Sequence, residues 1–266
     1  MIKIILFTIF LKILLIHGTI QRMTYELNSK IHSLEASSLI DFVLTQANDN
    51  LSTNSLEIET EDWVHQCCII VKSKGTLKIQ LKNGIYPRIT AFVGIRQPLV
   101  YIERSGVGSI TTTNKIYFDR LKLIISDTSH GNIQLEVTKN IDIVLSGSSS
   151  LTLSGRVNGT GNIRLNGVTN FDGRKCSMEK IHLTTEGITN TYVVARNQLN
   201  IHSSSIGTIY YRGPIGKLHQ QGLGQIESMD DWDDRFFTSS SICHHLNYFH
   251  LIFIIEIIHL ISQRFI

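Results

Sequence analysis

The sequence has little proline and no marked excess of charge. Its 266 residues include three prolines, and 25 Lys and Arg stand against 22 Asp and Glu, which gives a net charge of +3. Proline removes a backbone donor from a sheet, so its scarcity favours extensively paired strands. A charge this balanced does not favour binding to nucleic acid or to a strongly anionic surface.

Spacings typical of metal and phosphate sites are also missing. The sequence holds no Cys-x-x-Cys pair or His spacing that would bind zinc. Three Gly-x-Gly runs, at 106–108, 159–161 and 222–224, lead into strand-like sequence and lack the P-loop lysine, which indicates turns. The acidic run Asp230–Asp234 lacks the turn glycine of a calcium loop and reads as a solvated linker. We therefore expect no metal, no cofactor and no catalytic cluster.

The four cysteines are Cys67, Cys68, Cys176 and Cys243. An even number permits disulfides in a secreted chain. On a strand, the adjacent Cys67 and Cys68 point to opposite faces, so only one of them could readily face a given partner. Either could be bridged to Cys176, and a buried free thiol is the alternative.

What the chain does have is a repeated strand-and-turn unit, clearest at Ile141–Gly155. Ile141, Ile143 and Leu145 alternate with other residues, the small-residue turn 146–150 follows, and Leu151 and Leu153 alternate again. Alternation indicates a half-buried strand, and runs of Ser and Gly indicate tight turns. Similar units lie on both sides, with apolar strand residues at 121–125, 133–137, 163–165, 181–183, 192–194, 199–201 and 209–211.

The turns recur about every 18–21 residues, a period typical of a stacked repeat. A single unit cannot bury its apolar edge, whereas stacked units join these edges into one core. We predict an all-β fold, a right-handed parallel β-solenoid over residues 39–228. Its inward side chains include Ile143, Leu145, Leu153, Leu165 and Leu183. An antiparallel sandwich with Gly/Ser hairpins is the alternative, because its turns come every 8–12 residues.

The first third lacks this clean period. Residues 19–38 read as a lead-in, 39–44 and 56–58 as opening strands, and 63–71 as a strand that contains Cys67 and Cys68. Asn83-Gly84 is a strong hairpin signal. This part of the chain is predicted to be a cap or a less regular first set of rungs.

Three stretches carry a resemblance to a known family: Ser146–Gly155, Ser105–Ile110 and the Tyr-Tyr ending within Gly207–Pro214. They resemble the GIN domain (DUF2807), a family of autotransporter adhesin head domains, over roughly residues 39–226. The chain departs from that pattern at Asp127–His130 and Thr185–Thr189, where a turn Gly or Ser is replaced. The resemblance implies a β-solenoid at the cell surface or envelope, and it implies no catalytic residue.

Both ends of the chain are apolar. Residues 1–18 have the charged start, apolar core and small final residue of a signal peptide, with an uncleaved anchor as the alternative. Linker 229–245 contains Ser239 and Ser240, candidate attachment residues for a GPI anchor, and the hydrophobic tail 246–266 follows. The spacer is short and Glu256 interrupts the tail, so a membrane helix, an amphipathic partner helix or a mistranslated end are the alternatives.

Export would make two sequons relevant, at Asn50 and Asn158, which are our candidate N-glycosylation sites. Asn158 falls in a predicted turn, where a glycan could be accommodated outside the core. A chance match to the three-residue pattern is the alternative for each of them.

Within the clean repeat no two carboxylates come into register. One period away from Asp142 lie Lys122 and Asn162, and Glu136 faces Arg156. Glycosidases need two carboxylates about 5–10 Å apart, so we expect a secreted or surface adhesin-like protein that binds a surface glycan or protein without catalysis. A carbohydrate-active β-helix enzyme and a self-stacking structural solenoid are the alternatives. Paired carboxylates in a groove would favour the enzyme, and the first third is not covered by this argument.

Overall fold

The computed structural model of the chain describes residues 19–27, 30–37, 39–47, 54–67, 69–82 and 84–230. They belong to the first of two compact units, which ends at Asp230. The first third of the described chain contains seven strands and one short helix: β1 (Ile20–Tyr25), β2 (Ser33–Ala36), β3 (Ile40–Gln46), β4 (Ser55–Glu61), α2 (Asp62–Cys67), β5 (Ile69–Lys74), β6 (Thr76–Leu81) and β7 (Ile89–Ile95).

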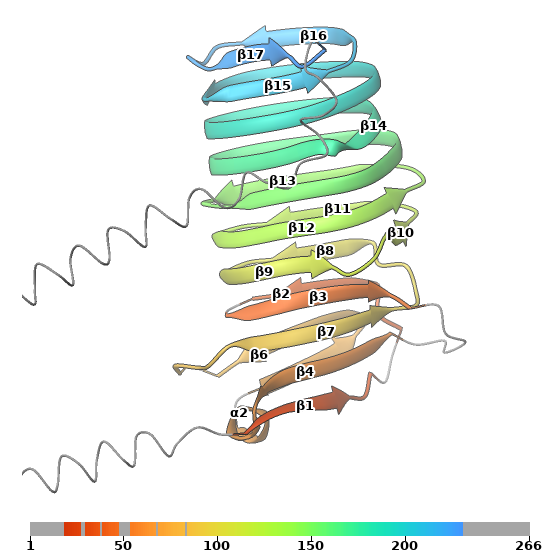
Figure 1. The fold of residues 1–266 in the computed structure, drawn as a ribbon, viewed down its shortest axis with the longest axis vertical. Helices are drawn as coiled ribbons and strands as arrows, with labels where there is room; N and C mark the ends of the chain where they lie inside the picture. The colour runs from red at the N-terminus through yellow and green to blue at the C-terminus, as the bar shows by residue number, and fades with distance from the viewer. Residues whose placement is uncertain are drawn as a thin grey trace, which may run out of the picture. The chain divides into compact units, whose positions relative to one another are not determined.

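The rest of the described chain is built from strands. They are β8 (Tyr101–Arg104), β9 (Val107–Thr112), β10 (Ile116–Phe118), β11 (Leu121–Ile125), β12 (Thr128–Val137), β13 (Ile141–Gly147), β14 (Ser150–Ile206), β15 (Thr208–Arg212), β16 (Ile215–Gln220) and β17 (Gln225–Ser228). The long strand β14 winds through several successive turns of the stack (Figure 1).

The predicted β-solenoid is confirmed, because each turn pairs in parallel with the next. Tyr101 lies beside Lys122, Ile141 beside Gly161, and Thr191 beside Ile209, which gives spacings of 21, 20 and 18 residues. The sandwich alternative is wrong, since from β8 onward the strands pair in parallel with the next turn instead of pairing back as hairpins. The right-handed sense of the coil stays a prediction.

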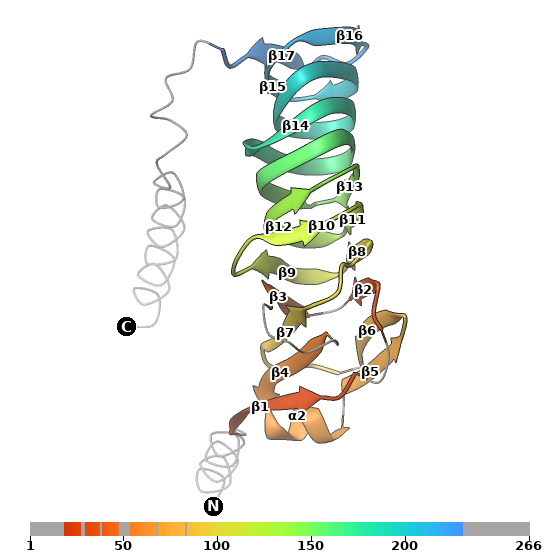
Figure 2. The same cartoon turned by 90° about the vertical axis from the view of Figure 1, so that its right-hand side faces the viewer.

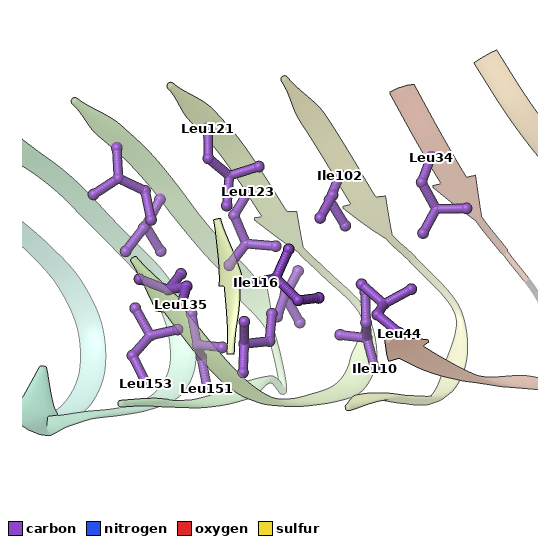
Figure 3. Packing of buried hydrophobic residues seen from close by; sticks show 14 of the residues in the cluster. Leu34, Leu44, Ile102, Ile110, Ile116, Leu121, Leu123, Leu135, Leu151 and Leu153 are labelled. Carbon is purple, nitrogen blue, oxygen red and sulfur yellow. The ribbon is translucent and has the colours of Figure 1, made fainter. Parts of the chain in front are cut away.

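Alternate residues of each strand point into one continuous apolar core. Strand β13 shows the pattern: Ile141, Ile143 and Leu145 are fully buried while Asp142 is exposed. Figure 3 shows side chains from successive turns, among them Leu123, Leu135 and Leu153, converging in this interior. All five predicted core residues are buried: Ile143, Leu145, Leu153, Leu165 and Leu183.

One corner of the stack is a column of left-handed residues. Gly147, Gly167 and Gly187 have φ of 73°, 100° and 87°, and Asp127 takes φ of 61° in the same column. A Cβ on Gly167 would lie 2.5 Å from the carbonyl oxygen of Gly147, so the close stacking itself requires glycine there. Asp127 tolerates this conformation, and its carboxylate accepts a 2.8 Å hydrogen bond from the Gly106 amide. The departures from the family pattern at 127 and 185–189 therefore leave the stacking intact.

The first third is stacked out of sequence order. Strands β2 and β3 form a turn that lies between β6/β7 on one side and β8/β9 on the other (Figure 1). Leu34 therefore lies beside Leu77, 43 residues later, and beside Ile102, 68 residues later. Strand β1 pairs antiparallel with β4, which in turn pairs antiparallel with β7 (Figure 2). The lead-in 19–38 thus contributes two paired strands.

Two local predictions for this third were wrong. Residues 62–67 form helix α2, where a strand was predicted from residue 63, and only 69–74 continue as strand. Val64 is the single buried residue of α2, so this segment adds one side chain to the core and lacks the alternating buried face of a strand. The hairpin is at Gly75, where β5 and β6 pair antiparallel, whereas the strands flanking residues 83–84, β6 and β7, pair with other strands.

Candidate functional site

The outer faces of the stack are ladders of polar side chains. Because the turns are in register, equivalent outward residues meet: the Asn162 amide donates to the Asp142 carboxylate at 2.7 Å, and Asn200 Nδ2 lies 3.1 Å from His182 Nδ1. The registers predicted from the period are confirmed, with Asp142 beside Lys122 and Asn162, and Glu136 beside Arg156. These ladders bring no two carboxylates together at those positions.

A carboxylate pair in register does occur where the first third meets the regular part. Glu35 on β2 lies beside Glu103 on β8, and neighbouring strands are about 4.8 Å apart. The pairing joins residues 68 positions apart, so the repeat period could not reveal it. In-register carboxylates are therefore missing only at the positions compared in the regular part of the chain, and they do occur at β2 and β8.

Both carboxylates of this pair have close partners. Lys78 Nζ lies 2.7 Å from Glu35, and the Tyr101 hydroxyl donates to Glu103 at 2.5 Å. Partial burial of Tyr101, followed by this hydrogen bond and the charges of both glutamates, raises the pKa of Tyr101 to about 12. The Lys78–Glu35 ion pair joins β6 to β2, whereas the Tyr101–Glu103 hydrogen bond lies within β8, so the ion pair fastens the inserted turn to its β6 neighbour.

A hollow of about 260 Å³ lies at the end of the stack formed by β1, β4 and β7. Glu59 and Glu61 contribute to it from β4, where they lie on the outward face because Ile58 and Thr60 point inward. Alternate residues of a strand are about 6.6 Å apart, so the two carboxylates stand side by side. The lining residues are Ile20, Glu59, Thr60, Glu61, Pro87, Arg88 and Thr90.

Arg88 provides the positive charge of the hollow. Its Nε lies 3.2 Å from Asp41, while 81% of its side chain is exposed. Burial opposes ionisation of Asp41, but hydrogen bonds from Ser109 and from Arg88 outweigh it and lower the pKa of this carboxyl. Asp41 on β3 is therefore a stable anchor for the Arg88 guanidinium, which lines the hollow together with the glutamates of β4.

An aromatic pair adjoins the hollow. Trp63 Nε1 donates to Glu61 at 2.6 Å, and the Trp63 ring stacks on Tyr86 with centroids 6.1 Å apart. Tyr86 directly precedes the lining residue Pro87. The combination of two carboxylates, an exposed guanidinium and a stacked indole can bind a polar ligand that also has apolar faces. The i, i+2 spacing of Glu59 and Glu61 was a readable signal in the sequence.

The predicted modification sites have different outcomes. Asn158 is exposed, where β14 passes over Lys139, and Gly159 is required there because a Cβ would collide with the Lys139 carbonyl oxygen. An exposed corner can accommodate a glycan, and its presence stays a prediction. Asn50, Ser239 and Ser240, together with 1–18 and the tail 246–266, lie outside the described residues.

The cysteines also differ. Cys176 is a free thiol, 1% exposed, so the suggested bridge from Cys67 or Cys68 to Cys176 is wrong and the buried-thiol alternative holds. The Cys176 side chain is part of the apolar core of the stack. Cys67 at the end of α2 is disulfide-bonded, and Cys68 lies outside the described residues.

Neither a metal centre nor a membrane helix is found in the part of the chain that the structure describes. No group of three or more His, Cys, Asp or Glu side chains there could hold a metal ion. None of the described helices is long and apolar enough to cross a membrane.

A family model described as "Putative auto-transporter adhesin, head GIN domain" matches residues 32–214, which includes the inserted turn β2–β3 and all turns up to β15. The chain belongs to the GIN domain family. None of the curated proteins compared with it matches.

Solved structures show the same fold at low sequence identity. A putative adhesin from Bacteroides fragilis has a TM-score of 0.70 and 18% identity, over 79% of this chain and 97% of that one. A putative adhesin from Parabacteroides merdae has a TM-score of 0.58 and 17% identity, over 80% and 97%. A protein from Parabacteroides distasonis described as a putative lipid-binding protein has a TM-score of 0.57 and 17% identity, over 80% and 97%.

The Tyr-Tyr ending of the GIN domain has a clear physical basis in this structure. Tyr210 stacks on Tyr192 of the turn below with centroids 4.9 Å apart, and Tyr211 packs against the core. Arg212 donates to the Met229 carbonyl at 3.3 Å. Gly213 has φ of 111°, and a Cβ there would collide with the Ala195 carbonyl oxygen. The motif thus closes the last regular turn.

Proposed function

We propose that this chain is a secreted or cell-surface adhesin-like protein that binds a surface glycan through the hollow beside β4, without turning it over. The observation that carries the proposal is the hollow itself, in which Glu59, Glu61 and Arg88 meet beside the stacked Trp63. Carboxylates and guanidinium groups bind sugar hydroxyls and acidic substituents, and an indole packs against the apolar face of a sugar ring. Membership of a family of adhesin head domains supports a surface location and a binding role.

A glycan-binding measurement on the purified full chain tests the proposal. Screening on a glycan array, followed by calorimetry with the best ligand, should give binding that Arg88→Ala weakens at least about tenfold, the cost of losing a charge-assisted hydrogen bond. Arg120→Ala is the matched control, because Arg120 is an exposed arginine on another part of the stack. Equal binding by both variants, or no binding by the parent chain, would contradict the proposal.

The enzyme alternative now has a specific observation in its favour. Glu59 and Glu61 lie two positions apart on the same face of β4, about 6.6 Å along the backbone, and glycosidases use a pair of carboxylates that flank the scissile bond. The two functions separate cleanly with Glu59→Gln, which keeps the shape and the hydrogen-bonding oxygen. For a binding protein no glycan is cleaved by the parent or the variant, whereas cleavage that Glu59→Gln abolishes would show an enzyme.

A further inference from the structure

The hollow beside β4 has an excess of negative charge. Its charged lining residues are Glu59, Glu61 and Arg88. The charge of Arg88 is already compensated, because its Nε lies 3.2 Å from the carboxylate of Asp41. Within the described part of the chain, neither glutamate takes part in an ion pair. Two carboxylates of the hollow are thus left without a counter-charge.

The arginine of the neighbouring strand does not supply this counter-charge. Arg22 on β1 is opposite Glu59 in the antiparallel pairing with β4. Its Nε nevertheless lies 2.6 Å from Glu57, and its guanidinium carbon lies 3.8 Å from the centroid of the Phe92 ring. These two contacts hold the guanidinium over the next position of the sheet. The charge of Arg22 is therefore used by Glu57, and Glu59 stays available to a ligand.

The ion pair of Arg88 persists at neutral pH. Burial would raise the pKa of Asp41, but hydrogen bonds from Ser109 and Arg88 outweigh it and lower the pKa of this carboxyl. Asp41 therefore remains ionised, and the pair that it forms with Arg88 has no net charge. The Arg88 side chain is still 81% exposed, so its remaining N–H groups can donate hydrogen bonds to a ligand. The hollow thus offers neutral-pair donors next to uncompensated carboxylates.

The remaining walls of the hollow suit the ring of a sugar. Ile20 and Pro87 are apolar lining residues, and Ile20 is 74% exposed. Helix α2, which carries Trp63, lies beside β1 and β4 (Figure 1 and Figure 2), and its indole stacks on Tyr86. Exposed aromatic and apolar groups pack against the C–H faces of a sugar ring. The volume of about 260 Å³ is below the roughly 300–1,000 Å³ of pockets for drug-sized ligands, which favours a single sugar unit.

We propose that the hollow binds an amino sugar with a free ammonium group, which lies between Glu59 and Glu61. This inference rests on the proposed glycan site and names the class of its ligand. The two glutamates are spaced about 6.6 Å along β4, and an ammonium that donates at about 2.8 Å to each carboxylate bridges such a spacing. Hydrogen bonds between ionised groups are roughly twice as strong as neutral ones. The ammonium therefore provides the counter-charge that the hollow lacks.

Other ligands leave part of the hollow without a partner. An N-acetylated or neutral sugar would partly desolvate the carboxylates of Glu59 and Glu61 without a counter-charge, which is costly. An acidic sugar would be repelled by them. A lysine side chain has an ammonium, but only methylene groups lie next to it, so the donors of Arg88 would find no acceptor. An amino sugar has hydroxyl oxygens close to its ammonium and satisfies both kinds of group.

Calorimetry on the full chain with two matched ligands tests the inference. The glucosamine tetramer and the N-acetylglucosamine tetramer differ only in the acetyl groups that remove the charge. At pH 6 the glucosamine tetramer should bind at least about tenfold more tightly, the gain from a charge-assisted contact. Glu59→Gln, which keeps the shape of the side chain, should reduce this ratio to about threefold or less. Glu186→Gln is the matched control, because Glu186 is an exposed glutamate outside the hollow, and it should leave the ratio unchanged.

The outcomes separate the ligand class from the site. Equal affinity for the two tetramers, or the same ratio in Glu59→Gln and in the parent chain, would overturn the inference. If another glycan binds more tightly than the glucosamine tetramer and its binding depends on Arg88, the proposed glycan site stands and the ammonium inference is wrong. If no glycan binds at all, both are wrong.

Competition and salt give independent measurements. Screening by salt weakens contacts between exposed charges, so raising NaCl from about 50 mM to about 500 mM should weaken binding of the glucosamine tetramer several-fold. Binding that is insensitive to salt would contradict a bound ammonium. Methyl glucosaminide should displace the tetramer at concentrations at which Nα-acetyl-lysine amide does not. If the lysine compound displaces it equally well, the hollow recognises an ammonium without a sugar and the inference is wrong.

Discussion

The first third of the stack and the part from Tyr101 onward are built from the same kind of turn, but they reach it differently. From Tyr101 onward each strand meets the strand about one turn later, for example Leu123 beside Ile143. In the first third the neighbours are 43, 49 or 68 residues apart, as in the pairs Leu34–Leu77, Ile40–Ile89 and Leu34–Ile102, or they run antiparallel. Regular stacking therefore does not require regular sequence.

The two regions also differ in where their chemistry lies. The regular part has ladders of neutral and paired side chains, whereas the hollow lies in the first third and the Glu35–Glu103 pair lies where the first third meets β8. Strands that are brought together out of sequence order can combine unlike residues, such as Arg88 and Asp41. A strict repeat offers only whatever its period brings into register.

The largest effect should come from breaking the close backbone stacking of the regular part. Gly155 has φ of 119°, and a Cβ would collide with the Leu135 carbonyl oxygen, so Gly155→Ala should lower the free energy of unfolding by about 4 kcal/mol. Gly75 in the first third has φ of 72° with open space around it, so Gly75→Ala should cost only about 1 kcal/mol. Urea denaturation measures both, and equal costs would contradict the difference in stacking.

Core packing should be equally tight in both regions. Leu145→Ala, in the regular part, and Leu56→Ala, in the antiparallel part, each remove a fully buried side chain and should cost about 2–5 kcal/mol. Asp142→Ala, on the exposed face, should change stability by less than about 0.5 kcal/mol. Thermal unfolding of the three variants is the measurement. A cost for Leu56→Ala as small as that for Asp142→Ala would show that the first third is loosely packed.

A smaller, pH-dependent effect should come from Asp172. Burial opposes its ionisation, but hydrogen bonds from Arg174 outweigh this and lower the pKa of the Asp172 carboxyl. A lowered pKa stabilises the fold above the unfolded value of about 3.9, and this stability is lost as the pH falls below it. Asp172→Asn should therefore cost about 1 kcal/mol at pH 7 and little at pH 2. Stability curves that stay parallel from pH 7 to pH 2 would contradict this.

The smallest perturbation concerns the thiols. Burial raises the pKa of the Cys176 thiol to about 12, so native protein at pH 8 should not be alkylated there until it unfolds. Cys67 in the first third should react only after reduction, because it is disulfide-bonded. Peptide mass spectrometry after iodoacetamide treatment distinguishes the two. Rapid native labelling of Cys176 would show that the regular core opens readily.

The regular part could be predicted from the sequence because its contacts repeat at constant separation. Ile143 and Leu165 lie on inward strand positions that alternation reveals directly. The place of Leu34 could not be predicted, because no local pattern specifies that β2 fits between β6 and β8. Helix α2 was missed since one buried residue, Val64, leaves no helical period to detect.

The residues of the hollow could be predicted only in part from the sequence, because some of them come from segments far apart along the chain. Glu59 and Glu61 follow the predicted strand 56–58, and their alternation could have been recognised. The approach of Arg88 and Ile20 depends on antiparallel pairing of β1, β4 and β7, which joins distant segments. No local sequence pattern specifies these pairings between distant strands, so the position of Arg88 relative to β4 could not be predicted.

The inserted turn β2–β3 has a mechanical consequence. A force applied at the start of the described chain reaches β1 first and then pulls on a turn that is clamped between neighbours on both sides. Extracting β3 requires shearing its hydrogen bonds to β7 and to β9 together, and β2 is further held by the Lys78–Glu35 ion pair. A terminal turn would peel away one bond at a time. The fold therefore places an element that resists extraction close to the start of the described chain.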